Sequence, residues 1–134
     1  NTEFDIVYFD NKEDIDLRER TETAQAIRAS LADVVIHCAS RVAGLGGHGG
    51  HHAEFLNDNL LINSNVTQAC AEQNKKLIAV SSVAAFPGDL QLLTEDRIHE
   101  SEVHSSEFGY ALSKRMLDTQ IQFKNGPCYT KFNP

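Results

Sequence analysis

A tyrosine and a lysine stand four residues apart in the run Tyr110-Ala-Leu-Ser-Lys114. On a helix, residues at this spacing share one face, so the two side chains are expected to be neighbours. A nearby ammonium favours the phenolate form of a phenol, which can then exchange a proton with a carbonyl or alcohol oxygen near neutral pH. Ser82, at the end of a strand-like run, can hydrogen-bond the same oxygen. These residues predict the catalytic group of a ketone/alcohol interconversion, which also requires a hydride carrier.

The spacing Tyr-x-x-x-Lys also arises by chance on amphipathic helices, so the surrounding elements decide its meaning. Sequence patterns predict strands over residues 4–9, 33–39, 76–81 and 128–132, helices over 21–30, 53–73 and 108–122, and loops over 44–50 and 89–107. The helix over 53–73 is either continuous or broken near Asp58. The run 33–39 is almost entirely apolar, as expected of a strand buried on both faces of a parallel sheet.

Strands that alternate with helices predict an α/β fold with a parallel sheet and helices on both of its faces. Ligands of such sheets bind beyond the carboxyl ends of the strands. Asp10, Ala39-Ser40 and Ser81-Ser82 all follow predicted strands. We therefore expect them along one edge of the sheet, close to one another.

The residues at the first of these strand ends leave the choice of cofactor open. Asp10 can accept hydrogen bonds from an adenosine ribose, which favours NAD, whereas Lys12 can meet a 2′-phosphate, which favours NADP. Asp16 and Leu17 can border an adenine ring. A solvated turn is an equally simple interpretation of each of these residues.

The run Gly44-Leu-Gly-Gly-His-Gly-Gly-His-His52 has three interpretations. A phosphate loop would lie after the first strand with G-x-G-x-x-G spacing, which this run does not show. A metal site would need a cysteine or carboxylate at a familiar distance from His48, His51 and His52. We prefer a mobile loop that borders a ligand cleft. For Asn59, Asn63 and Asn65, which fall within the helical region 53–73, surface polarity is the simpler interpretation, although one buried asparagine can bridge neighbouring strands.

Composition limits the classes of function. A length of 134 residues predicts one domain, and the net charge of -7 without a lysine or arginine cluster argues against nucleic-acid binding. The sequence has no long apolar segment and no signal-peptide pattern, so we do not expect a membrane partner. Cys38, Cys70 and Cys128 are odd in number and widely spaced, and two lie in apolar runs, so buried thiols in a reducing cytoplasm are expected.

Four segments together resemble the extended short-chain dehydrogenase/reductase family: residues 33–45, 59–66, 76–87 and 108–118. The resemblance implies an enzyme with a Rossmann-like doubly wound parallel sheet, NADP (or NAD) as cofactor and a nucleotide-sugar substrate. It also implies a cytoplasmic homodimer that associates through the helices over 53–73 and 108–122. Within the family, the chain is most similar to NADP-dependent reductases, some of them epimerases as well, of nucleotide-diphosphate 4-keto-6-deoxy sugars. A nucleotide-sugar 4-epimerase or dehydratase is the alternative.

The resemblance also implies a role for each matching residue. Ser82 would hydrogen-bond the keto oxygen, Tyr110 would be the acid/base, and Lys114 would bind the nicotinamide ribose. Residues implied to border the cofactor's adenine or line its site are Asp16, Leu17, Ala39, Ser40 and Val42.

Departures from the family pattern qualify these expectations. The family has a cysteine for epimerisation two residues after its serine, where this chain has Ala84, and a methyl group cannot carry a proton. The family's first strand with its G-x-x-G-x-x-G loop and most of its substrate domain have no counterpart in residues 1–134. We therefore expect a partial NAD(P)-binding domain that binds cofactor weakly by itself. A non-catalytic fragment that binds a nucleotide or a partner remains the alternative from another class.

Overall fold

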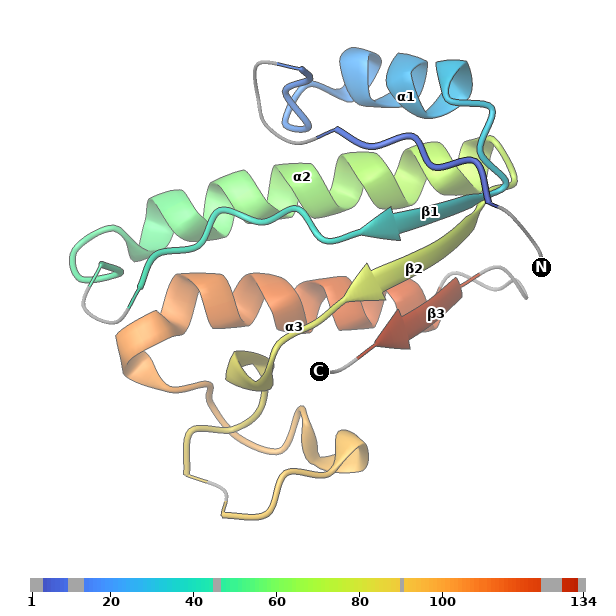
Figure 1. Ribbon diagram of the computed structural model, residues 1–134. Coiled ribbons are helices and arrows are strands. Elements are labelled where there is room, and N and C mark those ends of the chain that lie inside the picture. The colour runs from blue at the N-terminus through green and yellow to red at the C-terminus, as the bar shows by residue number, and fades with distance from the viewer. Residues whose placement is uncertain (1–3, 10–13, 45–46, 90, 124–128, 133–134) are drawn as a thin grey trace.

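The computed structural model describes residues 4–9, 14–44, 47–89 and 91–123, and the backbone of 129–132. The helices and strands follow one another in the order α1 (Arg20–Ala29), β1 (Val34–His37), α2 (His52–Glu72), β2 (Lys76–Val80), α3 (Phe108–Phe123) and β3 (Tyr129–Phe132) (Figure 1). Three short 3-10 turns, η1 (Val83–Ala85), η2 (Glu95–Arg97) and η3 (Ser105–Glu107), lie between β2 and α3. The helix predicted over 53–73 is continuous.

The described strands form one parallel sheet in the order β1-β2-β3. Val35 is in register with Leu77, and Leu77 with Tyr129. Each pair of neighbouring strands is joined through a helix, because parallel strands need a long crossover connection. The predicted α/β class with a parallel sheet is therefore confirmed.

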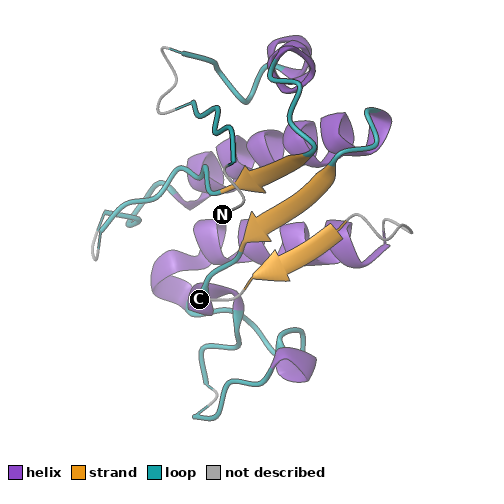
Figure 2. Ribbon diagram, turned by 45° about the vertical axis from the view of Figure 1, so that its right-hand side comes forward, coloured by secondary structure: helices purple, strands orange, loops and turns teal. Residues whose placement is uncertain are grey.

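The core lies between the sheet and the helices α2 and α3, which cover the same face (Figures 1 and 2). Its buried apolar residues are Ile27, Val66, Ala69, Cys70, Leu77, Ala79, Leu117 and Ile121. On the other face, Val34 and Ile36 of β1 are 43% and 65% exposed. The prediction that this strand is buried on both faces is wrong, because no described helix covers that second face.

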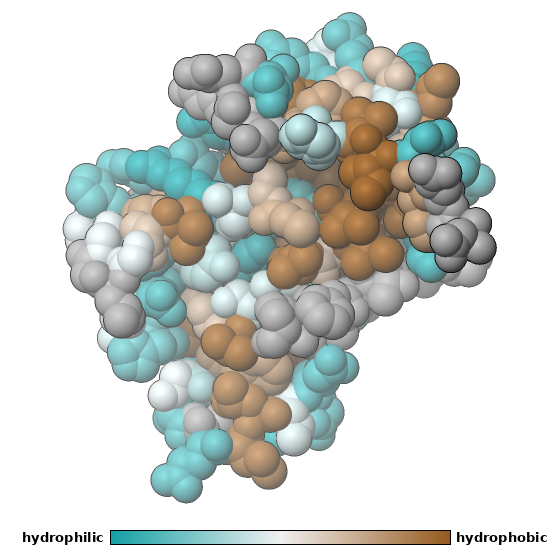
Figure 3. Space-filling model, in the orientation of Figure 1, coloured by the Kyte–Doolittle hydropathy of each residue, from teal (hydrophilic) through white to brown (hydrophobic). Residues whose placement is uncertain are grey.

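The strand predicted over residues 4–9 does not form, and the segment runs as irregular chain. Phe4, Ile6 and Tyr8 are each almost four-fifths exposed. An apolar run becomes a strand only where a neighbouring edge takes up its backbone hydrogen bonds, and no described strand pairs with this segment. Figure 3 shows apolar side chains gathered on the face of the molecule in front of β1.

The cysteine prediction is half right. Cys70 is fully buried in α2, whereas Cys38 is exposed where the chain leaves β1. Cys128 lies outside the described residues. Within the described part of the chain, no helix combines the length and the apolar character that a membrane span requires.

Candidate active site

Tyr110 and Lys114 lie one turn apart near the start of α3, as predicted. The Lys114 ammonium nitrogen is 5.8 Å from the centroid of the Tyr110 ring, and it donates a hydrogen bond of 2.9 Å to the carbonyl oxygen of Val80. Val80 ends β2, so the pair sits at the carboxyl edge of the sheet. Lys114 is only 3% exposed, and burial lowers its pKa. Tyr110 is half-buried, so a ligand can approach its side chain.

Ser82 follows β2 by two residues and caps η1. Its hydroxyl oxygen accepts a hydrogen bond of 3.2 Å from the backbone nitrogen of Ala84. Because the oxygen acts as an acceptor there, the hydroxyl hydrogen can be donated to another group. Arg115 ties this turn to α3 by donating to the carbonyl oxygens of Ala85 at 2.9 Å and Ser101 at 2.7 Å. The structure thus brings Ser82, Tyr110 and Lys114 to one edge of the sheet.

A buried network fixes α3 at the position of Lys114. His37 of β1 places Nε2 3.0 Å from Oδ1 of Asn63 in α2, and Asn63 donates from Nδ2 to the carbonyl oxygen of Ser113 at 3.3 Å. Burial lowers the pKa of His37 to about 4, and the positive charge of Lys114 acts in the same direction. A neutral His37 therefore donates from Nε2 to the amide oxygen of Asn63. The Asn63 side chain thus links β1 to α3.

A cavity of about 420 Å³ opens beside the end of β1. It is lined by Ile15, Asp16, Leu17, Arg18, Ser40, Arg41, Asp58 and Ile62. Three of the residues predicted to border a cofactor therefore come together. Ala39 and Val42 lie exposed on the same loop, outside the lining of the cavity. Asp10 and Lys12 lie outside the described residues.

The charges around this cavity are paired. Arg18 binds Asp16 at 2.7 Å and Asp58 at 3.4 Å, and Arg41 binds Asp58 at 2.7 Å and Glu54 at 3.3 Å. The hydrogen bonds to these carboxylates raise the pKa of both arginines. Two cations facing three carboxylates leave no excess positive charge, so the cavity suits an uncharged ring group better than a phosphate.

Asn59 locks the loop after β1 onto α2. Its Oδ1 accepts from the backbone nitrogen of Arg41 at 2.7 Å and from the Ser40 hydroxyl at 2.9 Å, and its Nδ2 donates to the Arg41 carbonyl oxygen at 2.8 Å. Asn65 likewise donates to the carbonyl oxygen of Leu17 at 2.9 Å. Asn59, Asn63 and Asn65 are all buried, so the interpretation as surface polarity is wrong. Phe55, Asn59 and Asn63 stand four residues apart, and in the structure they share one buried face of α2.

Within the described part of the glycine loop only His48 is buried, whereas the glycines and His51 are exposed. His48 is 1% exposed, although we expected a mobile border of a cleft. Among the described residues, no three histidine, cysteine, aspartate or glutamate side chains are placed to hold a metal ion. No signal in the sequence distinguished His48 from the exposed His51.

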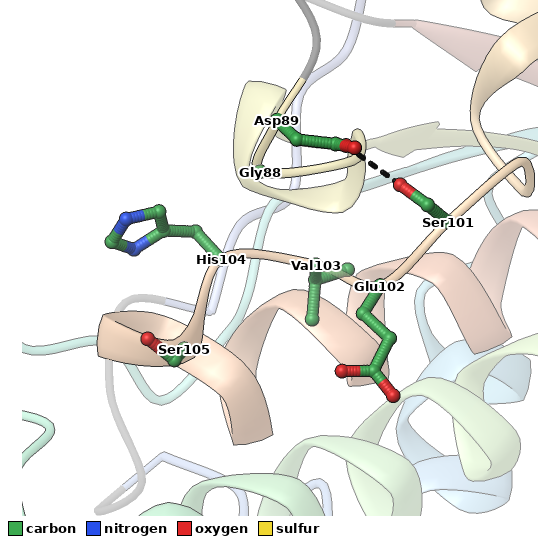
Figure 4. Close-up of a pocket in the computed structure, with 7 residues that line it drawn as sticks. All are labelled: Gly88, Asp89, Ser101, Glu102, Val103, His104 and Ser105. Carbon is green, nitrogen blue, oxygen red and sulfur yellow. Dashed lines mark hydrogen bonds between the residues drawn. The ribbon is translucent and has the colours of Figure 1, made fainter.

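A second cavity, of about 380 Å³, lies between residues 88–89 and 101–105 (Figure 4). The Ser101 hydroxyl donates to Asp89 at 2.7 Å across it, while the imidazole of His104 points away. Its lining contains none of the residues predicted to catalyse a reaction or to bind a cofactor. The candidate site is therefore the sheet edge beside β2, where Ser82, Tyr110 and Lys114 lie.

Residues 3–124 match the model of the NAD dependent epimerase/dehydratase family. The chain belongs to this family. It is 35% identical to a GDP-L-fucose synthase of Dictyostelium discoideum, over 96% of this chain and 41% of the relative. It is 33% identical to a probable GDP-L-fucose synthase of Drosophila melanogaster, over 95% of this chain and 41% of the relative. It thus spans about two-fifths of the length of these curated relatives.

The architecture of this epimerase/dehydratase family member agrees with a solved structure. The GDP-L-fucose synthetase of Naegleria fowleri bound to NADP superposes with a TM-score of 0.83 at 29% identity, over 94% of this chain and 41% of that chain. The Rossmann-like class predicted from the sequence is thereby confirmed. The predicted resemblance to extended dehydrogenase/reductases is confirmed as well.

Proposed function

We propose that the full-length protein is an NADP-dependent reductase of a nucleotide-diphosphate 4-keto-6-deoxy sugar, of the GDP-L-fucose synthase type. The observation that carries the proposal is the placement of Ser82, Tyr110 and Lys114 at one sheet edge. The likeness to GDP-L-fucose synthases and to a structure with NADP supports the substrate class and the cofactor.

The residues present fit such a cofactor. The cavity beside β1 suits an adenine ring, with Asp16, Leu17 and Ser40 in its lining, and Lys114 lies at the other strand end, where a ribose hydroxyl could bind it. One hydrogen of the ammonium goes to Val80, which leaves two for further acceptors. When bound, a reduced nicotinamide supplies the hydride for the carbonyl carbon.

The protein's own side chains then handle the carbonyl oxygen. The Ser82 hydroxyl donates a hydrogen bond to it and holds the carbonyl in place. As the carbon becomes tetrahedral, negative charge develops on the oxygen, and the Tyr110 hydroxyl transfers its proton there. The Lys114 ammonium stabilises the phenolate that remains. The product is the alcohol, and Tyr110 regains its proton from solvent.

Epimerisation is not part of the leading proposal. Ala84 lies half-buried, two residues after Ser82, and carries only a methyl group where epimerisation needs an acid/base. A nucleotide-sugar 4-epimerase or dehydratase is the second candidate, because Ala84 departs from the fucose-synthase pattern while Tyr110 and Lys114 are present. The homodimer through α2 and α3 and the cytoplasmic location stay predictions.

The test is NADPH consumption by the full-length protein with GDP-4-keto-6-deoxymannose. Tyr110→Phe removes the transferable proton and should lower kcat by about 10²-fold or more. Tyr8→Phe, an equal change at an exposed tyrosine, should leave turnover unchanged. Unchanged turnover in Tyr110→Phe would contradict the proposed mechanism. Analysis of the product distinguishes reduction from epimerisation and dehydration. A full-length protein without any turnover would favour a binding module.

A further inference from the structure

His48 joins the glycine loop to the ring of Tyr110. Its imidazole is 1% exposed, with its centroid 4.6 Å from that of Phe55 and 5.9 Å from that of Tyr110. Both separations lie in the range of favourable aromatic contacts. The Tyr110 ring therefore has two side-chain neighbours: Lys114, one turn further along α3, and His48 of the glycine loop.

The imidazole is held in this position by hydrogen bonding. Its Nε2 lies 2.8 Å from the carbonyl oxygen of Ala43 and 3.8 Å from a carboxylate oxygen of Glu107. Both neighbours are acceptors, so Nε2 carries a hydrogen and donates it to Ala43. Nδ1 is buried, and the described residues offer it no hydrogen-bond partner.

Glycines permit two close contacts here, one within the loop and one between the loop and α3. A Cβ at Gly47 would lie 2.7 Å from the Cβ of Ala43. At Gly109, a Cβ would overlap the carbonyl oxygen of His52. Gly109 directly precedes Tyr110, so the glycine loop and the first turn of α3 are fitted to each other at the catalytic tyrosine.

We infer that His48 is a positioning residue, whose ring fixes the orientation of the Tyr110 ring. The inference rests on the proposed function in one respect, the acid/base role of Tyr110. A phenol in a half-buried site has other rotamers, and each moves its hydroxyl group away from the substrate oxygen. A contact across the ring removes that freedom, and a misplacement of about 1 Å can cost about 10²-fold in rate.

Two variants of the full-length protein separate the ring from the hydrogen bond. His48→Phe keeps an aromatic ring and loses the donor to Ala43, whereas His48→Gln keeps a donor and loses the ring. His51→Ala, at an exposed histidine of the same loop, is the control. The first measurement is an NMR spectrum with ¹³C-labelled tyrosine, in which Tyr110 is assigned from the Tyr110→Phe spectrum. The second is kcat and KM.

We expect His48→Phe and His51→Ala to keep one sharp set of Tyr110 ring signals. His48→Gln should give broadened or multiple signals, and its kcat should fall by about 10²-fold with KM nearly unchanged. Sharp signals in both position-48 variants, or equal disorder in both, would overturn the inference. Sharp signals in the glutamine variant alone would make His48 a loop tether instead. The NMR result needs no turnover, so it decides the inference even if the proposed reaction is not observed.

Discussion

Lys114 and His37 show how burial sets the charge of single residues in this protein. Lys114 is buried beside the end of β2, and its ammonium is satisfied there by the Val80 carbonyl oxygen. Burial lowers the pKa of Lys114, and it lowers that of His37 to about 4. His37 therefore stays neutral and donates to Asn63, which keeps a second positive charge away from Lys114.

This arrangement predicts a loss of stability in acid. The ordinary pKa of 6.5 applies to His37 in the unfolded chain, and the folded value is about 4. Between these values the unfolded state binds more protons, so the free energy of unfolding falls as the pH drops. The contribution of His37 is complete above pH 6.5 and is lost towards pH 4, by about 3 kcal/mol in total.

Urea unfolding of the full-length protein at several pH values in this window measures the effect. His37→Gln keeps a donor for Asn63 but cannot titrate, so its stability should depend less on pH than that of the wild type. Parallel curves for wild type and His37→Gln would contradict the prediction.

At the scale of elements, α2 positions the site although it supplies no catalytic residue. Asn59 holds residues 40–41 beside the cavity at the end of β1, and Asn63 holds β1 to α3. The buried polar face of one helix thus sets the distance between the two halves of the proposed site.

Asn59→Ala should therefore destabilise the protein and weaken cofactor binding. It leaves the backbone nitrogen and oxygen of Arg41 without their partner, at a cost of about 1–3 kcal/mol. Without this clamp the loop bearing Ser40 is free to move, so the KM for NADPH should rise more than kcat falls. Asn57→Ala, at an exposed position of α2, is the control and should change neither. Thermal unfolding and NADPH titration give the answer; equal effects of the two variants would argue against the clamp.

Gly109→Ala tests the fit between α3 and the glycine loop. The new methyl group overlaps the His52 carbonyl oxygen, so the helix or the loop must shift. Overpacking of this kind costs about 1–3 kcal/mol, and here it displaces Tyr110. Gly44→Ala meets nothing within 4 Å and should be neutral. The comparison needs the melting temperature and kcat of both variants, and a fully active Gly109→Ala protein would disprove the close fit.

At the scale of the whole molecule, one face of the sheet is not covered by any described helix. Val34 and Ile36 of β1 are exposed there, and Phe4, Ile6 and Tyr8 add to the apolar surface. An apolar surface of this kind is normally covered. The residues proposed to hold a cofactor lie only beside the ends of β1 and β2.

We therefore predict that the 134-residue chain by itself binds NADPH weakly or not at all. It should also bind the apolar dye ANS through its open sheet face. Calorimetry with NADPH and ANS fluorescence measure the two properties, with the full-length protein as the comparison. Tight NADPH binding by the isolated chain would refute the first expectation.

The sequence by itself determined the α/β class and most element positions, and it singled out the three residues proposed to be catalytic. Apolar runs and helical spacing are local signals, and Ser82, Tyr110 and Lys114 sit at fixed offsets from them. The bounds of the helical region over 53–73 follow from the same signals, whereas the structure decided between one continuous helix and a break near Asp58. Family membership followed because the resemblance is spread over nearly the whole chain.

Only the tertiary structure decided which polar residues are buried and which apolar ones are exposed. Phe4–Phe9 has the pattern of a strand but lacks a paired edge, and Cys38 follows a buried-looking run yet is exposed. Asn59, Asn63 and His48 look like surface residues, but distant backbone groups and rings enclose them. Burial depends on what packs against a residue from elsewhere in the chain, and no local pattern contains that information.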